Sequence, residues 1–72
     1  FHLIFLDPPF TIGLKELQKV LESAESCLAP GGTVVVEHSP LIKEFSLQNL
    51  TVVDQRVYGD EAVSFFKRPG ER

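Results

Sequence analysis

Residues 1–10 read FHLIFLDPPF, and this stretch decides the fold. Bulky apolar side chains fill five of its first six positions, without the polar alternation of a half-buried strand. Such a run is typical of a strand covered on both faces, as in parallel sheets. The two prolines that follow Asp7 stop the run, because proline fixes φ and lacks a backbone donor. The opening therefore predicts a buried parallel strand that ends at Leu6.

Beyond this strand the apolar positions take the period of a helix. They recur at intervals of three and four residues: Leu14, Leu17, Leu21, Ala24 and Leu28. Residues 30–32, Pro-Gly-Gly, supply the helix stop. The pattern predicts a helix over residues 14–29, and we expect Cys27, which flanks the stripe, to be a small buried hydrophobe.

The remaining sequence predicts three more strands. Residues 33–36, TVVV, form a second β-branched run, so strand, helix and strand follow one another as in a right-handed βαβ unit. Residues 39–49 allow a short helix or an irregular connection, and we predict the helix. Residues 50–58 and 62–67, separated by Gly-Asp-Glu, indicate an antiparallel hairpin. The fold class is α/β, with two parallel strands, a crossover helix and a closing β-hairpin.

Composition excludes several classes of function. A net charge of -3 argues against a polyanion-binding surface built from this chain alone. One Cys and two His cannot supply a four-ligand zinc site, so we expect no metal. No apolar stretch approaches the ~20 residues of a membrane span, and we expect a cytoplasmic protein without membrane contact. One helix for four strands would leave a sheet face bare, which suggests half of a domain.

The most informative residues for function are Asp7, Pro8, Pro9 and Phe10. They follow a parallel strand, and ligands of open α/β sheets bind beyond the carboxyl ends of the strands. A carboxylate, a rigid carbonyl and an aromatic ring suit a planar group that bears an amine. The alternative is structural, since Asp followed by Pro is also an ordinary helix N-cap and first-turn pair.

Glu37 and His38 are weaker candidates for the same pocket. They follow the second parallel strand, so they are expected at the sheet edge that carries Asp7. A Glu-His pair at a strand end is also compatible with simple solvation or capping.

Three blocks of the chain resemble known methyltransferases. Residues 1–10, with DPPF, are similar to the fourth motif, (D/N)PP(Y/F), of amino-group methyltransferases that use S-adenosylmethionine. Residues 28–37 resemble the turn and fifth strand of the same fold. Residues 56–60 and 62–68 resemble the closing hairpin of one family, the bacterial small-subunit (16S) ribosomal RNA guanine-N2 methyltransferases. The first motif indicates the class, and the last block points to the ribosomal RNA family.

The resemblance implies a fragment of a Rossmann-like class I methyltransferase sheet. Residues 1–68 would be the C-terminal half of the domain, and 69–72 an exposed tail. S-adenosylmethionine would be bound mainly by a missing N-terminal half, because the glycine-rich cofactor motif has no counterpart in this chain. Cofactor-binding residues are therefore unassigned, and the chain alone is expected to be inactive.

The resemblance also implies roles for the residues of the fourth motif. Asp7 and the Pro8 carbonyl would accept hydrogen bonds from the exocyclic amine of a flipped guanine in 16S ribosomal RNA, Pro9 would hold the turn, and Phe10 would stack on the base. The partner would be ribosomal RNA or an assembling small subunit. Two alternatives remain: a DNA or other amino-group methyltransferase, and a non-catalytic α/β module that pairs through an exposed sheet edge.

Overall fold

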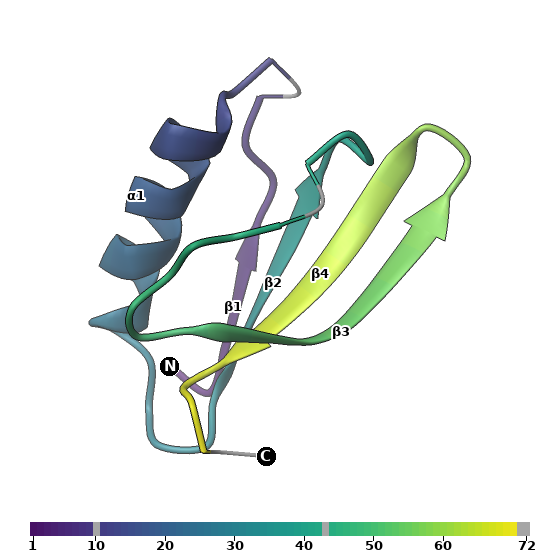
Figure 1. Cartoon of the computed structure of the whole chain (residues 1–72). Helices are drawn as coiled ribbons and strands as arrows, with labels where there is room; N and C mark the ends of the chain where they lie inside the picture. Colours follow the sequence, from purple (N-terminus) through teal and green to yellow (C-terminus); the bar gives the residue numbers. More distant parts are fainter. Residues whose placement is uncertain (10, 43, 71–72) are drawn as a thin grey trace.

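The computed structural model describes residues 1–9, 11–42 and 44–70. It contains five elements in chain order: β1 (Leu3–Leu6), α1 (Leu14–Glu25), β2 (Thr33–His38), β3 (Thr51–Tyr58) and β4 (Glu61–Lys67). The strands form one sheet in the order β1-β2-β4-β3 (Figure 1). β1 and β2 are parallel, whereas β4 is antiparallel to both of its neighbours. The predicted fold class is confirmed, including the crossover helix and the closing hairpin.

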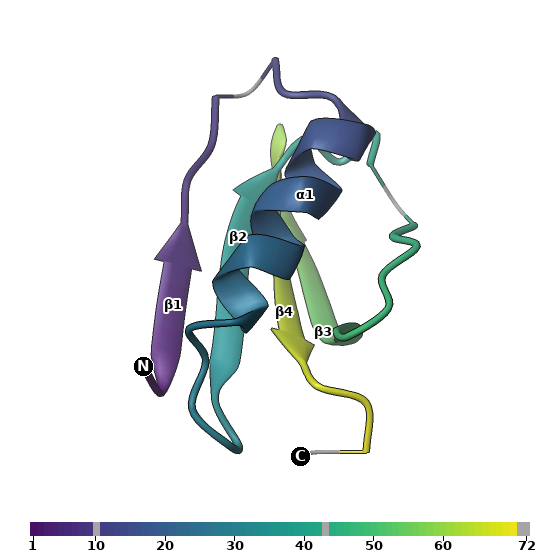
Figure 2. The ribbon, with the colours of Figure 1, turned by 90° about the vertical axis from the view of Figure 1, so that its left-hand side faces the viewer.

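α1 covers one face of this sheet (Figure 2). Leu17 and Leu21 of the helix are fully buried. They belong to one core cluster with Val34, Val36 and Phe66, which come from the centre of the sheet. Leu28 and Leu50 complete the buried cluster. The apolar stripe of the helix therefore packs from Leu17 onward as its period of three and four residues predicts, whereas Leu14 at the start of α1 is exposed.

No helix among the described residues covers the opposite face of the sheet. Successive strand residues point to opposite faces, and Ile4 and Leu6 pack against the core, so Leu3 and Phe5 point away from it. Their side chains are 64% and 57% exposed. Phe5 lies beside Val35, and Val35 lies beside Phe65, so an apolar row crosses three strands. We call this surface the bare face.

The predicted short helix over residues 39–49 is wrong for the described residues 39–42 and 44–49, which form the alternative, an irregular connection with a turn and a bend. The second part of this link, residues 44–49, bonds to side chains of α1 through its backbone N–H groups. Ser46 N–H donates to Gln18 Oε1 at 2.7 Å, and Gln48 N–H donates to Glu22 Oε1 at 3.0 Å. The apolar residues of the link, Ile42, Phe45 and Leu47, pack against the core. The weak apolar pattern of this segment therefore marks an irregular connection that covers the core, and not a helix.

α1 also ends earlier than predicted, at Glu25 instead of Ala29. The helix is followed by tighter turns of the 3₁₀ type, in which Cys27 N–H and Leu28 N–H donate to carbonyls three residues earlier. Cys27 is exposed, so the expectation that it is buried is wrong. No helix in the described residues is long and apolar enough to cross a membrane.

Arg68 holds the end of α1 against the end of β4. Its Nη2 donates to the carbonyls of Glu25 and Leu28, at 2.9 and 2.6 Å. Its Nη1 reaches the Ala29 carbonyl at 3.3 Å, and its Nε pairs with the Glu25 carboxylate at 2.6 Å. Carbonyls at a helix end lack partners within the helix, and a cation there also suits the helix dipole.

Replacing Arg68 with alanine should lower the free energy of unfolding by about 2 kcal/mol, because these carbonyls lose a charged donor. Chemical denaturation measures the effect. Arg56→Ala is the matched control, since Arg56 pairs with Asp54 on the surface and both side chains are about half exposed or more, at 60% and 49%. A hydrogen bond with Tyr58 and the charge of Asp54 raise the pKa of Arg56, but such exposed pairs contribute little to stability. Equal losses in the two variants would contradict the role of Arg68.

Candidate functional site

The candidate site lies where the two parallel strands end. Leu6 and Val36 are neighbours at the end of the β1–β2 ladder. Asp7 leaves the sheet directly after Leu6, whereas β2 continues through Glu37 and His38, which pair with β4. The tip of the β3–β4 hairpin lies at the same end of the sheet, which is the top of Figure 1. This edge is the usual position of ligand sites in open α/β sheets.

A cavity of about 130 Å³ opens at this edge, lined by Asp7, Pro8, Glu37, His38 and Glu61. The structure thus brings together four of the six residues proposed from the sequence. Pro9 is exposed and does not line the cavity, but its carbonyl accepts the Ile12 N–H at 2.9 Å and closes a turn. Phe10 lies outside the described residues.

Glu61 is a member of the site that the sequence did not reveal. It is the first residue of β4, and its neighbour Ala62 pairs with His38 at the end of β2. The pairing of β4 with β2, instead of with β3 alone, brings Glu61 to the cavity. No motif marks this position, because strand pairing between distant segments is set by tertiary packing.

The helix-cap alternative for Asp7 is excluded by the geometry. α1 begins at Leu14, and its N-cap is Gly13, which makes no side-chain cap. Asp7 therefore lies six residues before the N-cap position. Among the described residues its carboxylate forms no hydrogen bond or ion pair, so it remains an available acceptor at the cavity.

The cavity is rich in hydrogen-bond acceptors. Three of its five lining residues carry carboxylates, and none is Lys or Arg. Carboxylates accept hydrogen bonds and attract N–H groups. The volume is well below the roughly 300–1,000 Å³ of pockets for drug-sized ligands, so the cavity fits one edge of a ligand and not a whole nucleotide.

The cavity's acidic residues do not form a metal site. Within the described part of the chain, no group of three or more His, Cys, Asp or Glu side chains is arranged to hold a metal ion. His38, the best ligand type among them, has both ring nitrogens occupied by other partners. Nδ1 lies 2.8 Å from the Ser39 carbonyl, and Nε2 lies 2.7 Å from Ser64 Oγ.

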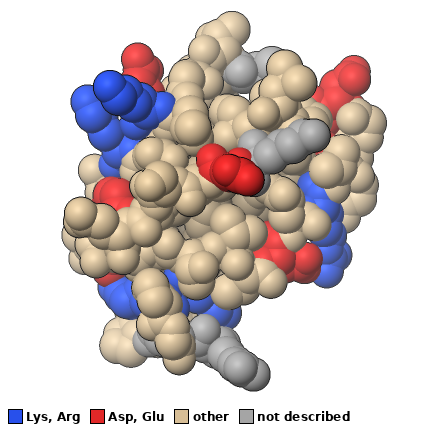
Figure 3. Space-filling view, in the orientation of Figure 1, with Lys and Arg blue, Asp and Glu red and all other residues tan. Residues whose placement is uncertain are grey.

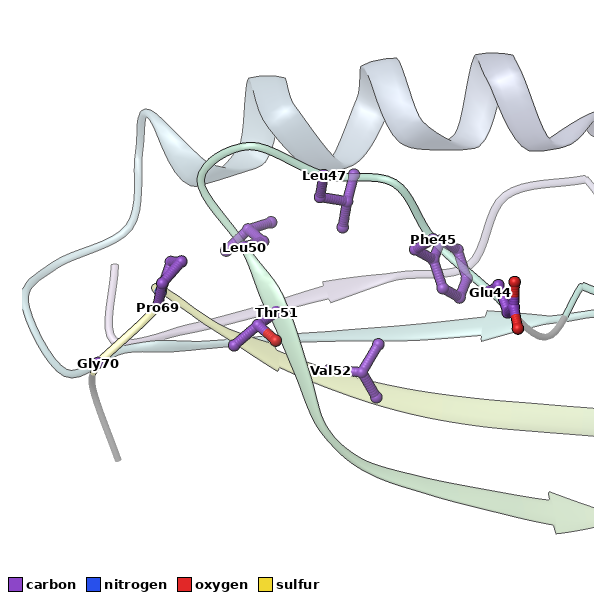
Figure 4. Close-up of a pocket in the computed structure, with 8 residues that line it drawn as sticks. All are labelled: Glu44, Phe45, Leu47, Leu50, Thr51, Val52, Pro69 and Gly70. Atoms are coloured by element: carbon purple, nitrogen blue, oxygen red, sulfur yellow. The ribbon is translucent and has the colours of Figure 1, made fainter.

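A larger hollow, of about 700 Å³, lies beside the link, the start of β3 and the segment after β4 (Figure 4). Its described walls include Leu50, Thr51, Val52 and Pro69, with Glu44 as the charged residue among them. It lies away from the carboxyl ends of the parallel strands, and the described residues that line it bring no set of reactive groups together. We therefore assign the site to the smaller cavity.

The described Lys and Arg side chains form no continuous patch on the face seen in Figure 3. They lie in separate places at its margins, with uncharged and acidic side chains between them. Together with the net charge of -3, this distribution leaves little attraction for a polyanion.

Comparisons with known proteins agree with the architecture. Residues 1–67 match the family model described as conserved hypothetical protein 95. A conserved hypothetical protein from Streptococcus pyogenes is 26% identical with a TM-score of 0.78, and the match covers 100% of this chain and 46% of that one. No curated protein matches the chain.

Two other similar structures carry names that mention methylation. A candidate methylase from Haemophilus influenzae, HI0767, is 25% identical with a TM-score of 0.72, over 94% of this chain and 42% of that one. A candidate methyltransferase from Escherichia coli, yhhF, is 28% identical with a TM-score of 0.69, over 93% and 38%. The chain thus spans less than half the length of these proteins.

The family match includes the DPPF motif, the turn before β2 and the closing hairpin, which are the three blocks that carry the resemblance described above. The fold of the structural relatives agrees with the same assignment. The chain belongs to the family described as conserved hypothetical protein 95, and the solved structures similar to it include candidate methyltransferases.

Proposed function

We propose that the protein transfers a methyl group from S-adenosylmethionine to the exocyclic amine of a guanine in 16S ribosomal RNA, and that this chain supplies the amine-binding half of the site. One observation carries the proposal: Asp7 and Pro8 meet two further carboxylates in a small cavity at the carboxyl edge of the parallel strands. The methyltransferase names of two similar structures support the reaction type.

The cavity fits the reacting end of such a methyl donor better than its nucleoside. A sulfonium is a cation, and the carboxylates of Asp7, Glu37 and Glu61 would attract positive charge. The chain has no glycine-rich turn for the nucleoside, so those contacts belong to the rest of the protein. When bound, S-adenosylmethionine supplies the electrophilic methyl group.

Asp7 and Pro8 would act on the amine by orientation and electrostatics. The lone pair of an exocyclic amine is delocalised into the ring, so the nitrogen is a poor nucleophile. Two acceptors that bind its N–H groups, the Asp7 carboxylate and the Pro8 carbonyl, would direct the lone pair toward the methyl group. Once methylated, the amine nitrogen would be positively charged, and Asp7 would accept the proton that it loses. The resemblance assigns stacking of the base to Phe10.

The remainder of the protein would provide what this chain lacks. The bare face, with Leu3 and Phe5 more than half exposed, would be covered by the N-terminal half of the domain. The same half would supply basic surface for ribosomal RNA or an assembling small subunit, because this chain is acidic overall.

The direct test uses the full-length protein with methyl-labelled S-adenosylmethionine. We expect labelling of 16S ribosomal RNA or small-subunit particles, with N2-methylguanine found by mass spectrometry after digestion. Residues 1–72 alone are expected to transfer no label. Labelling of DNA but not RNA would overturn the substrate, and would favour the alternative of a DNA amino-group methyltransferase.

A second candidate function is a non-catalytic module that pairs through a sheet edge. The exposed apolar residues of β1 and the fully exposed strand β3 favour it. A melting temperature that rises with protein concentration, together with no methyl transfer to any nucleic acid, would support this alternative.

A further inference from the structure

His38 is a buried polar residue at the edge of the sheet that carries the candidate site. It is 4% exposed, and Ser64, to which it bonds, is fully buried. Ser64 Oγ also lies 2.8 Å from Gln55 Nε2 on the neighbouring strand β3. Three side chains from three strands therefore form one line of hydrogen bonds that ends at the Ser39 carbonyl.

The partners at the two ends give this line a direction. A carbonyl oxygen only accepts, so His38 Nδ1 carries a hydrogen and donates to Ser39. The Gln55 amide nitrogen only donates, so Ser64 Oγ accepts from it and can give its own hydrogen to His38 Nε2. With His38 as the neutral Nδ1–H tautomer, every donor in this line has an acceptor. The tautomer is thus assigned from the hydrogen-bond partners of the ring.

His38 also fixes the segments that surround the cavity. The Ser39 carbonyl that accepts from Nδ1 accepts the Ile42 N–H at 3.0 Å as well, so the ring anchors the turn after β2. The ring of Phe45 in the link packs edge-on against His38, with centroids 5.3 Å apart. The His38 side chain itself lines the cavity beside Asp7 and Pro8.

We propose that His38 is a positioning residue for the amine pocket, and that the β3–β4 hairpin sets its orientation through Gln55 and Ser64. The inference rests on the proposed function, because it concerns the pocket in which Asp7 acts. Both ring nitrogens are engaged, so His38 does not serve as the base. It keeps one wall of the cavity in place, and Asp7 and Pro8, which carry the acceptors for the amine, line the same cavity.

The main test is Ser64→Ala in the full-length protein, which removes the hydroxyl between His38 and Gln55. Two-bond ¹H–¹⁵N spectra of the imidazole should show the Nδ1–H tautomer in the parent and a mixture of tautomers in the variant. The His38 signals are assigned by their loss in His38→Gln.

The kinetic readout is methyl transfer. We expect kcat of Ser64→Ala to fall about tenfold or more because the cavity wall shifts, with KM for S-adenosylmethionine unchanged within about twofold. Ser23→Ala, the same change at an exposed helix position, should alter neither readout.

A second variant, Gln55→Glu, tests the direction of the line without disturbing the core, because Gln55 is exposed. A carboxylate accepts the Ser64 hydrogen, so the hydroxyl can no longer donate to Nε2, and the preference for the Nδ1–H tautomer should be lost. An Nε2–H tautomer in the parent, or spectra and kcat unchanged in both variants, would overturn the proposal. If the parent transfers no methyl group, the proposed function fails, whereas the tautomer spectra still decide whether the line exists.

Discussion

Replacing Asp7 with alanine is expected to lower kcat for methyl transfer by on the order of 10² or more, with little change in affinity for S-adenosylmethionine. The lost carboxylate is an acceptor that lies free at the cavity and would bind the reacting amine. An interaction made mainly in the transition state affects kcat more than substrate affinity. Single-turnover transfer of labelled methyl to RNA, with cofactor binding measured separately, gives both quantities.

Asp54→Ala is the matched control for this variant. Asp54 lies on the outer strand β3, where its exposed carboxylate pairs with Arg56 and accepts the Gln55 N–H at 2.8 Å. Its loss should leave kcat within about twofold of the parent, because surface pairs contribute little. Equal activity of Asp7→Ala and the parent would refute the role of Asp7 at the amine.

Replacing Phe66 with alanine is expected to lower the free energy of unfolding by about 3–5 kcal/mol. Phe66 is fully buried at the centre of the sheet. Its ring meets Phe45 edge-on, with centroids 5.1 Å apart, so the change opens a cavity between the sheet and the link. A loss of this size is a large part of the roughly 5–15 kcal/mol that stabilises a typical domain. Denaturant titration of the full-length protein measures it.

Phe66→Leu separates the cavity from the aromatic contact. Leucine refills most of the space, so its cost should be about half that of alanine or less. If both variants lose the same free energy, an empty cavity is not the cause. If Phe66→Ala loses less than about 1 kcal/mol, Phe66 does not hold the core together as described.

Much of the fold could be predicted from local patterns. The apolar run before Asp7, the period of Leu14, Leu17 and Leu21, and the β-branched run of β2 each indicate an element from neighbouring residues alone. The start of α1 at Leu14 and the hairpin were located correctly, because side-chain periodicity and turn residues act within a few positions. The helix end and the link were wrong, because Arg68, Gln18 and Glu22 decide them through contacts more than 25 residues away in sequence.

The candidate site could likewise be predicted in part from local sequence. The sequence indicated that Asp7 and Pro8 would meet Glu37 and His38, because parallel strands end at one edge, and the structure brings these four residues to one cavity. The roles proposed for them stay predictions. Glu61 could not be found, and neither could the bonding of His38 to Ser64, because both depend on β4 lying beside β2.

By itself, then, the sequence determined the four strands, the start of α1 and the position of Asp7 directly after a parallel strand, since backbone sterics and apolar period act over short distances. Only the tertiary structure decided the strand order, the cap on α1 and the partners of His38. These depend on which distant surfaces bury the most apolar area and satisfy the most buried polar groups, and no local pattern encodes that competition.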